Sequence, residues 1–206
     1  MSTTAFPVRQ SSGGVGTTDI QLRNIIRYLY PTKGIVGGLT VTGTTLMRYQ
    51  VAGGLAVCSK GESDGNTLAY YEGGTTNTVS TNSASNPRID VVWITSHDIT
   101  QGDSNNLVTL GVTTGTAAAA PAEPTIPTYA TKLASMLVPA GASTTAGCTQ
   151  YGTADYSIPY AANLGMMHNY LDTTNNVVYN QAVWIDQDAA IIDLPTDRIV
   201  HVHYSK

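Results

Sequence analysis

The stretch Asn86–Ile94, with the sequence NPRIDVVWI, decides the fold of this chain. Its Asn-Pro start opens a turn and pushes the following residues into extended geometry. The side chains then alternate before the run becomes continuously apolar, so Ile89 and Trp93 share one strand face. Arg88 and Asp90 share the opposite face, where they can pair or brace a neighbouring turn. The stretch predicts a central buried strand with Trp93 in the core.

Short segments rich in β-branched and apolar residues recur on both sides of that strand. They are separated by glycine pairs and polar turns, and such regular spacing is typical of an antiparallel β-sandwich or barrel. Gly53-Gly54 is interpreted as a hairpin turn between two of these segments. The chain is therefore predicted to be mainly β. The other predicted strands up to residue 142 are 39–43, 46–51, 55–58, 68–71, 76–80, 107–113 and 133–138.

One N-terminal amphipathic helix is predicted before the strands. Residues 18–21, Thr-Asp-Ile-Gln, have the form of a capping box, and Pro31 closes the segment. Apolar residues between them recur with helical spacing and form one apolar stripe. The stripe consists of Leu22, Ile25, Ile26 and Leu29. We expect it to pack within its own subunit, and packing on a partner helix is the alternative.

The chain is predicted to have three parts. Residues 1–16 are a polar arm that gains order only when something holds it. Residues 17–142 form the helix plus β-sandwich attachment domain. Residues 143–206 form a small β-rich C-terminal module, which begins with a linker at 144–147. The predicted strands of this module are 164–171, 177–179, 182–185, 189–192 and 199–204, with a turn at 172–176.

Three prolines spaced three residues apart, Pro121, Pro124 and Pro127, favour extended polyproline II geometry. Such a segment is a possible ligand for an aromatic groove on another protein. We interpret it instead as a strap that crosses the sandwich.

Charged residues are scarce in this chain. Asp, Glu, Lys and Arg make up 12% of its 206 residues, about half of the roughly 25% found in typical soluble domains. A surface with so few charges is poorly protected against association, so we expect neighbouring chains to cover much of it. The net charge of -4 and the lack of a Lys/Arg cluster argue against nucleic acid as a partner.

The N-terminal sequence lacks a basic region followed by an apolar run, and no stretch approaches the roughly 18 apolar residues of a membrane span. We therefore expect synthesis in the cytoplasm without a signal peptide, and no membrane insertion.

Cys58 and Cys148 are far apart in the sequence and fit no metal-ligand spacing. They are interpreted as two buried free thiols, with a disulfide as the open alternative.

No group of residues predicts a catalytic site or a cofactor. The carboxylate pairs Glu62/Asp64 and Asp186/Asp188 have a spacing that could set two acids on one strand face. Both pairs lie in apparent loops, so they are interpreted as solvated turn residues. His97 and its acidic neighbour are adjacent in sequence, whereas catalytic triads are assembled from separated positions.

His201 and His203 leave the same face of a predicted strand. Near a threefold axis, three copies would bring together imidazoles that could hold a metal ion. We favour the simpler interpretation, a polar outer face on the terminal strand, and assign no metal site.

Five segments in a fixed order carry a resemblance to a known family. They are GLTVTG (38–43), MRYQVAGGLAV (47–57), NPRIDVV (86–92), GTAAAAPAEP (115–124) and LASMLVPAGA (133–142). Together they resemble the minor tail or baseplate proteins of long-tailed bacteriophages of Gram-positive hosts. The resemblance implies a β-rich virion structural protein at the tail tip, homotrimeric, attached to other tail or baseplate proteins and supporting host attachment. It supplies no catalytic residues.

Two alternative functions stay open. One is a carbohydrate-binding receptor-recognition module of the same particle, in which exposed aromatic rings stack on host cell-wall glycan. Its candidate residues are Trp184, Tyr151, Tyr156 and Tyr160. The other is a glycan-cleaving tail enzyme. The argument against this hypothesis is that the sequence offers no credible acid/base pair.

Overall fold

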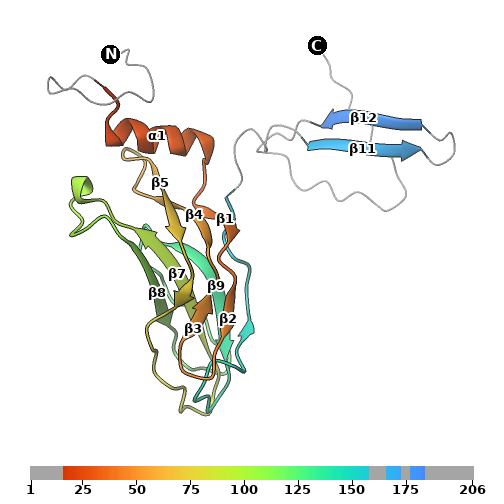
Figure 1. The fold of residues 1–206 in the computed structure, drawn as a ribbon. Helices are drawn as coiled ribbons and strands as arrows, with labels where there is room; N and C mark the ends of the chain where they lie inside the picture. The colour runs from red at the N-terminus through yellow and green to blue at the C-terminus, as the bar shows by residue number, and fades with distance from the viewer. Residues whose placement is uncertain (1–15, 158–165, 173–176, 184–206) are drawn as a thin grey trace. The chain divides into compact units, whose positions relative to one another are not determined.

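The computed structural model of this chain describes residues 16–157, 166–172 and 177–183. The chain divides into two compact units, residues 1–159 and 160–206. In its described part the protein is mainly β, with antiparallel sheets and one α-helix (Figure 1). None of the described sheets closes into a ring, so the barrel alternative is not formed there.

The predicted central strand is central in the structure. Strand β7 (Arg88–Ser96) lies between β8 (Val108–Thr114) and β9 (Thr131–Val138) and pairs antiparallel with both. A short strand, β10 (Thr149–Gln150), extends the sheet beyond β9. Because β7 has a neighbour on each side and an apolar run of side chains, both of its faces are largely buried.

Trp93 is only half-buried, which corrects its predicted place in the core. Its ring lies over Gly111 of β8, where an added Cβ would lie 2.2 Å from the ring. The indole N–H donates to Thr113 Oγ1 at 2.9 Å. The core cluster between the sheets uses Val92 and Ile94, on the other face of β7.

A second layer consists of two three-stranded sheets with the orders β1-β4-β5 and β2-β3-β6. Strand β1 continues into β2, β3 into β4 and β5 into β6, each time after two residues. The two sheets are therefore one antiparallel meander of three strands, each bent at the same level. The strands are β1 (Gly34–Gly38), β2 (Val41–Gly43), β3 (Tyr49–Val51), β4 (Gly54–Ser59), β5 (Asn66–Tyr71) and β6 (Gly74–Thr75).

The bend explains why the hairpin prediction at Gly53-Gly54 is wrong. Strands β3 and β4 do not pair with each other; the chain passes through these glycines from one sheet to the next. Glycine is required because the backbones meet here: a Cβ on Gly54 would lie 2.3 Å from Gly37 O, and Gly38 has a φ of 69°. The hairpin connections are residues 44–48 and 60–65. The predicted strand at 76–80 is also wrong, because β6 ends at Thr75.

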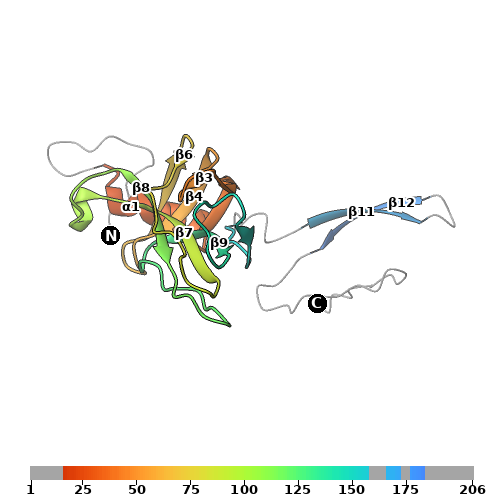
Figure 2. The same cartoon turned by 90° about the horizontal axis from the view of Figure 1, so that it is seen from below.

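The two layers share one hydrophobic core. Figure 2 shows β3, β4 and β6 on one side of it and β7 and β9 on the other. The meander contributes Ile35, Leu39, Tyr49, Val51, Ala56, Cys58 and Ala69, and the four-stranded sheet contributes Val92, Ile94, Leu133, Ala134 and Met136.

Helix α1 (Asp19–Leu29) begins with the predicted capping box. Gln21 N–H donates to Thr18 Oγ1 at 3.2 Å, and Thr18 N–H donates to Gln21 Oε1 at 2.9 Å. The helix packs beside β5 (Figure 1). Its packing face differs in part from the predicted one: Arg23 is its buried residue, Ile25 and Ile26 of the apolar stripe are half-buried, and Leu22 and Leu29 are 37% and 55% exposed.

Residues 143–157 belong to the first unit, so the boundary falls later than the predicted residue 142. Thr145 is fully buried, and its hydroxyl donates to Arg48 O at 2.7 Å, which excludes a linker at 144–147. Further on, Ile35 N–H donates to Asp155 O at 2.7 Å and Ser157 N–H donates to Ile35 O at 2.9 Å. These bonds add a short parallel segment to the edge of β1.

The proline-containing segment lies against the four-stranded sheet, as the strap interpretation predicts. Strands β8 and β9 flank β7 and run in the same direction, so the chain between them has to return along the sheet. On its way Ala118 N–H donates to Pro87 O at 3.0 Å. Glu123 then reaches β9, where its carboxylate lies 3.4 Å from Lys132 Nζ.

The described part of the second unit is a hairpin of β11 (Met166–Asp172) and β12 (Val177–Val183). Asp172 pairs with Val177, and residues 173–176 of the predicted turn lie outside the described residues. One strand stands where two, 177–179 and 182–185, were predicted. The predicted strands 189–192 and 199–204 lie outside the described residues.

Candidate functional site

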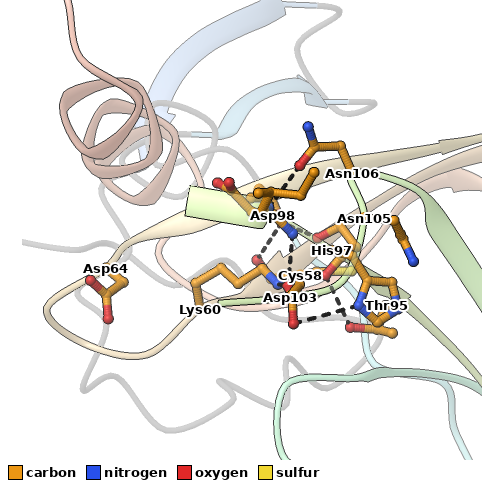
Figure 3. Close-up of polar contacts among 12 residues, drawn as sticks. Cys58, Lys60, Asp64, Thr95, His97, Asp98, Asp103, Asn105 and Asn106 are labelled. Carbon is orange, nitrogen blue, oxygen red and sulfur yellow. Dashed lines mark hydrogen bonds and ion pairs between the residues drawn. The ribbon is translucent and has the colours of Figure 1, made fainter. Parts of the chain in front are cut away.

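Charged side chains from three separate segments meet at one end of the two β layers, which we call the β body. The loop after β7 contains the short 3-10 helix η1 (Ile99–Gln101) and approaches both α1 and the loop between β4 and β5 (Figure 3). We call this group the loop cluster. It consists of Arg23, Lys60, Asp64, His97, Asp98 and Asp103.

Arg23 joins α1 to both loops. Its guanidinium forms an ion pair with Asp98, and its Nε–H donates to Asp64 O at 2.8 Å. Asp98 also caps η1, because its carboxylate accepts from Thr100 N–H at 2.9 Å. The hydroxyl of Thr100 and, in smaller part, Arg23 hold the pKa of Asp98 below its usual value. One buried side chain therefore fixes the orientation of the helix.

Lys60 and Asp103 form the other half of the loop cluster. Lys60 Nζ lies 2.6 Å from Asp103 Oδ2, which also accepts from Asp98 N–H at 2.7 Å (Figure 3). The hydrogen bond from Lys60 is the main reason why the pKa of Asp103 falls to about 2. His97 Nδ1 lies 3.6 Å from the other carboxylate oxygen.

The loop cluster is suited to holding structure. Its carboxylates Asp98 and Asp103 stay ionised at neutral pH and face cations, so neither is poised as a general acid. Within the described residues, no group of three His, Cys, Asp or Glu side chains is arranged to hold a metal ion. Glu62 is exposed in the β4–β5 loop and Asp64 is half-buried there, in line with the prediction of turn residues.

A second charged group lies in the core and confirms both predicted uses of Arg88. Its Nε–H donates to Asp90 Oδ1 at 2.8 Å, and its Nη2 donates to Ser80 O at 2.6 Å, which braces the turn before β7. Tyr49 donates its hydroxyl to Asp90 Oδ2 at 3.2 Å. Burial raises the pKa of Tyr49 far above its usual value, so this hydroxyl stays protonated.

Both cysteines are free thiols. Cys58 is fully buried, as predicted, whereas Cys148 is only half-buried. Burial raises the pKa of both thiols, which disfavours the reactive thiolate.

Two hollows lie side by side near the end of α1, and Lys33 and Thr128 line both of them. The first has a volume of about 350 Å³ and is lined by Arg27, Pro31, Lys33, Ser59, Gly61, Glu62, Asn66, Thr128 and Tyr129. The second has a volume of about 390 Å³ and is lined by Lys33, residues 123–128 of the strap, Lys132 and Asp155.

The two predicted glycan-stacking residues that the structure describes do not line these hollows. Tyr151 and Tyr156 are 54% and 67% exposed, as stacking requires, but neither borders either hollow. Tyr160 and Trp184 lie outside the described residues, as do His201, His203, Asp186 and Asp188.

Arg23, Arg27, Lys33 and Tyr129 were not predicted from the sequence. Arg23 and Arg27 are four residues apart on the polar side of α1, and that spacing is the one sequence signal that singles them out. Tyr129 follows the strap directly, and its position beside α1 depends on the path of the strap.

Across the described residues, no helix is both long enough and apolar enough to span a membrane. Comparison with protein-family models, with curated proteins and with solved structures found no match to this chain.

Proposed function

We propose that this chain is a virion structural protein of a phage tail tip or baseplate, which assembles with copies of itself, as a homotrimer, and supports host attachment. The two β layers form an antiparallel sandwich in this proposal, and other tail proteins are its further partners. The observation that carries the assembly role is the apolar stripe of α1, of which Leu22 and Leu29 are exposed and Ile25 is half-buried.

The stripe has the spacing of a helix-to-helix seam. Leu22, Ile25 and Leu29 follow one another at intervals of three and four residues, as the a and d positions of a coiled coil do. All three are uncharged, so an apolar partner surface suits them. A second copy of α1 offers the same stripe, and copies around a symmetry axis cover one another's stripes at once.

The helix is held ready for such a contact. Arg23 anchors a neighbouring side of α1 to the loop after β7, and the capping box fixes the first turn of the helix. An isolated helix of this length is marginal in water. Here the β body supplies the order, so association does not have to stabilise the helix as well.

The described polar groups also favour a structural role. Asp98 and Asp103 of the loop cluster face Arg23 and Lys60, and Asp90 faces Arg88 in the core. The Arg23–Asp98 and Lys60–Asp103 pairs tie separate segments together, and the Arg88–Asp90 pair braces one strand. Such pairing supports an interaction protein over a glycan-cleaving enzyme, which needs two opposed acids of different pKa.

Solution mass measured by light scattering tests the proposal. We expect the wild-type protein to have three times the 21.7 kDa of one chain. The double substitution Leu22→Glu/Leu29→Glu places charges on the stripe and should give the mass of one chain. Leu107→Glu is the matched control, because Leu107 is also exposed but lies in the loop before β8.

A wild-type protein that stays at the mass of one chain at high concentration would contradict the assembly role, as would a trimer that the double substitution leaves intact. The proposed position of this chain in the phage particle requires a separate test. An antibody against the chain should label the tail ends of the phage that encodes it, and label elsewhere would reject that placement.

A further inference from the structure

The two hollows beside α1 form one groove. They share Lys33 and Thr128, and the groove runs from the last turn of the helix to the strap. Each hollow has the volume of a small-ligand site. Three separate segments supply the walls: α1 with the turn after it, the β4–β5 loop, and the strap with the start of β9.

Two cations in this groove lack a carboxylate partner within the part of the chain that the structure describes. Lys33 Nζ donates to Ala130 O at 2.8 Å, and the guanidinium of Arg27 donates to Glu62 O. Both acceptors are neutral backbone carbonyls. By contrast, Arg23, Lys60 and Arg88, which lie outside the groove, each pair with an aspartate, and Lys132 in the second hollow pairs with Glu123. The first hollow is lined by these two cations and by one acid, Glu62, so it has a net positive charge that an anionic ligand would neutralise.

Tyr129 gives the same hollow an apolar surface. Its side chain is 48% exposed at the edge of the hollow, beside Gly61. Gly61 lies close to this side chain: a Cβ added to Gly61 would be in ordinary van der Waals contact with the Tyr129 hydroxyl, at 3.6 Å. An exposed tyrosine ring with polar groups around it suits a flat ligand that has one apolar face and many hydroxyls.

The remaining lining residues fit a carbohydrate. Glu62 and Asn66 offer side-chain oxygens that accept hydrogen bonds from sugar hydroxyls. In the second hollow, Pro124 and Pro127 form a stiff wall beside the Lys132–Glu123 ion pair. This hollow offers a place for the next unit of a chain.

We propose that the groove binds an anionic carbohydrate. A sugar ring packs on Tyr129, its carboxylate or phosphate group binds Arg27 and Lys33, and a second sugar unit occupies the hollow along the strap. The inference goes beyond the assembly role and does not depend on it, because the apolar stripe of α1 is not part of the groove.

Isothermal titration calorimetry with three probes tests the inference. Hexagalacturonate carries carboxylates, glucose 6-phosphate carries a phosphate, and maltohexaose is an uncharged chain. We expect one or both charged sugars to bind and maltohexaose not to bind, and we expect added salt to weaken the binding. Absence of binding by both charged sugars at millimolar concentration would overturn the inference, as would equal binding of maltohexaose.

Substitutions of groove residues test whether the ligand binds in the groove. Lys33→Gln should weaken binding about tenfold through loss of a charged hydrogen bond, and Tyr129→Ala should weaken it about fivefold through loss of the ring. Tyr129→Phe should keep most of the affinity, which separates loss of stacking from misfolding. Tyr151→Ala is the matched control, because Tyr151 is exposed outside the groove. Affinity unchanged by both Lys33→Gln and Tyr129→Ala would place the ligand elsewhere and reject the site.

Discussion

Arg88 and Arg23 are both buried arginines that pair with an aspartate, but they connect the chain over different ranges. Arg88 binds Asp90, two residues further along the same strand, and the whole pair is buried in the core. Arg23 binds Asp98, 75 residues away in the sequence and 18% exposed at the side chain. The first pair stabilises a layer from within, whereas the second attaches a helix to a finished layer.

The core pair should give the largest effect on stability. Asp90→Ala leaves the Arg88 guanidinium buried without a counter-charge, and we expect a loss of about 3–5 kcal/mol in the free energy of unfolding. Chemical denaturation followed by circular dichroism measures it. The double substitution Arg88→Met/Asp90→Leu removes both charges and should lose less. If the double variant were as unstable as the single one, packing and not charge would explain the loss.

Removal of Arg23, which anchors α1, should lower the free energy of unfolding by a smaller amount and destabilise only the segments that Arg23 contacts. Arg23→Met removes the ion pair with Asp98 and the bond to Asp64 O, and we expect a loss of about 2 kcal/mol because Asp98 is then reached by water. Hydrogen exchange should speed up in α1 and in residues 97–106 while β7 stays protected. Uniform loss of protection would show that α1 is part of the core.

Loss of the Lys60–Asp103 pair should lower the free energy of unfolding by the smallest amount. The pH dependence of stability should show the contribution of this pair. Asp103→Asn should cost about 1 kcal/mol at neutral pH. Because the folded protein lowers the pKa of Asp103 to about 2, the stabilisation is present above the ordinary pKa of about 4 and is lost as the pH falls through about 2. The difference in stability between wild type and variant should vanish there.

Glu72→Gln is the control for this pH dependence, since Glu72 is exposed at the bend after β5. Its substitution should leave the acid limb of the stability curve unchanged. If Asp103→Asn also leaves the loss of stability at acid pH unchanged, other carboxylates cause that pH dependence.

The difference between contacts within one segment and contacts between distant segments also explains which features can be predicted from the sequence. The capping box, the central strand and the Arg88–Asp90 pair each follow from one short stretch of sequence, and the structure contains all of them. Local geometry determines such contacts before the chain folds. The alternation of side chains in one strand was enough to place Asp90 beside its arginine.

Features that depend on a distant segment were predicted wrongly or missed. Thr145 has a polar neighbourhood typical of a linker, but its hydroxyl bonds to a carbonyl 97 residues earlier in the chain. The apolar stripe of α1 was expected to be its packing face, yet Arg23 found its partner in the η1 loop. The groove has the same origin, because Arg27, Lys33 and Tyr129 meet only after the strap has crossed the sheet.

The bend of the meander has a consequence for how this chain can change in length. Gly38 faces Gly54 across the first two strands, and Gly53 approaches the backbone of Glu72 in the third. Inserting or deleting one residue within any of these strands would bring a side chain to the crossing and push a neighbour aside. Natural or designed variants can therefore be lengthened in the connections at 44–48 and 60–65, whereas the spacing across the glycines is fixed.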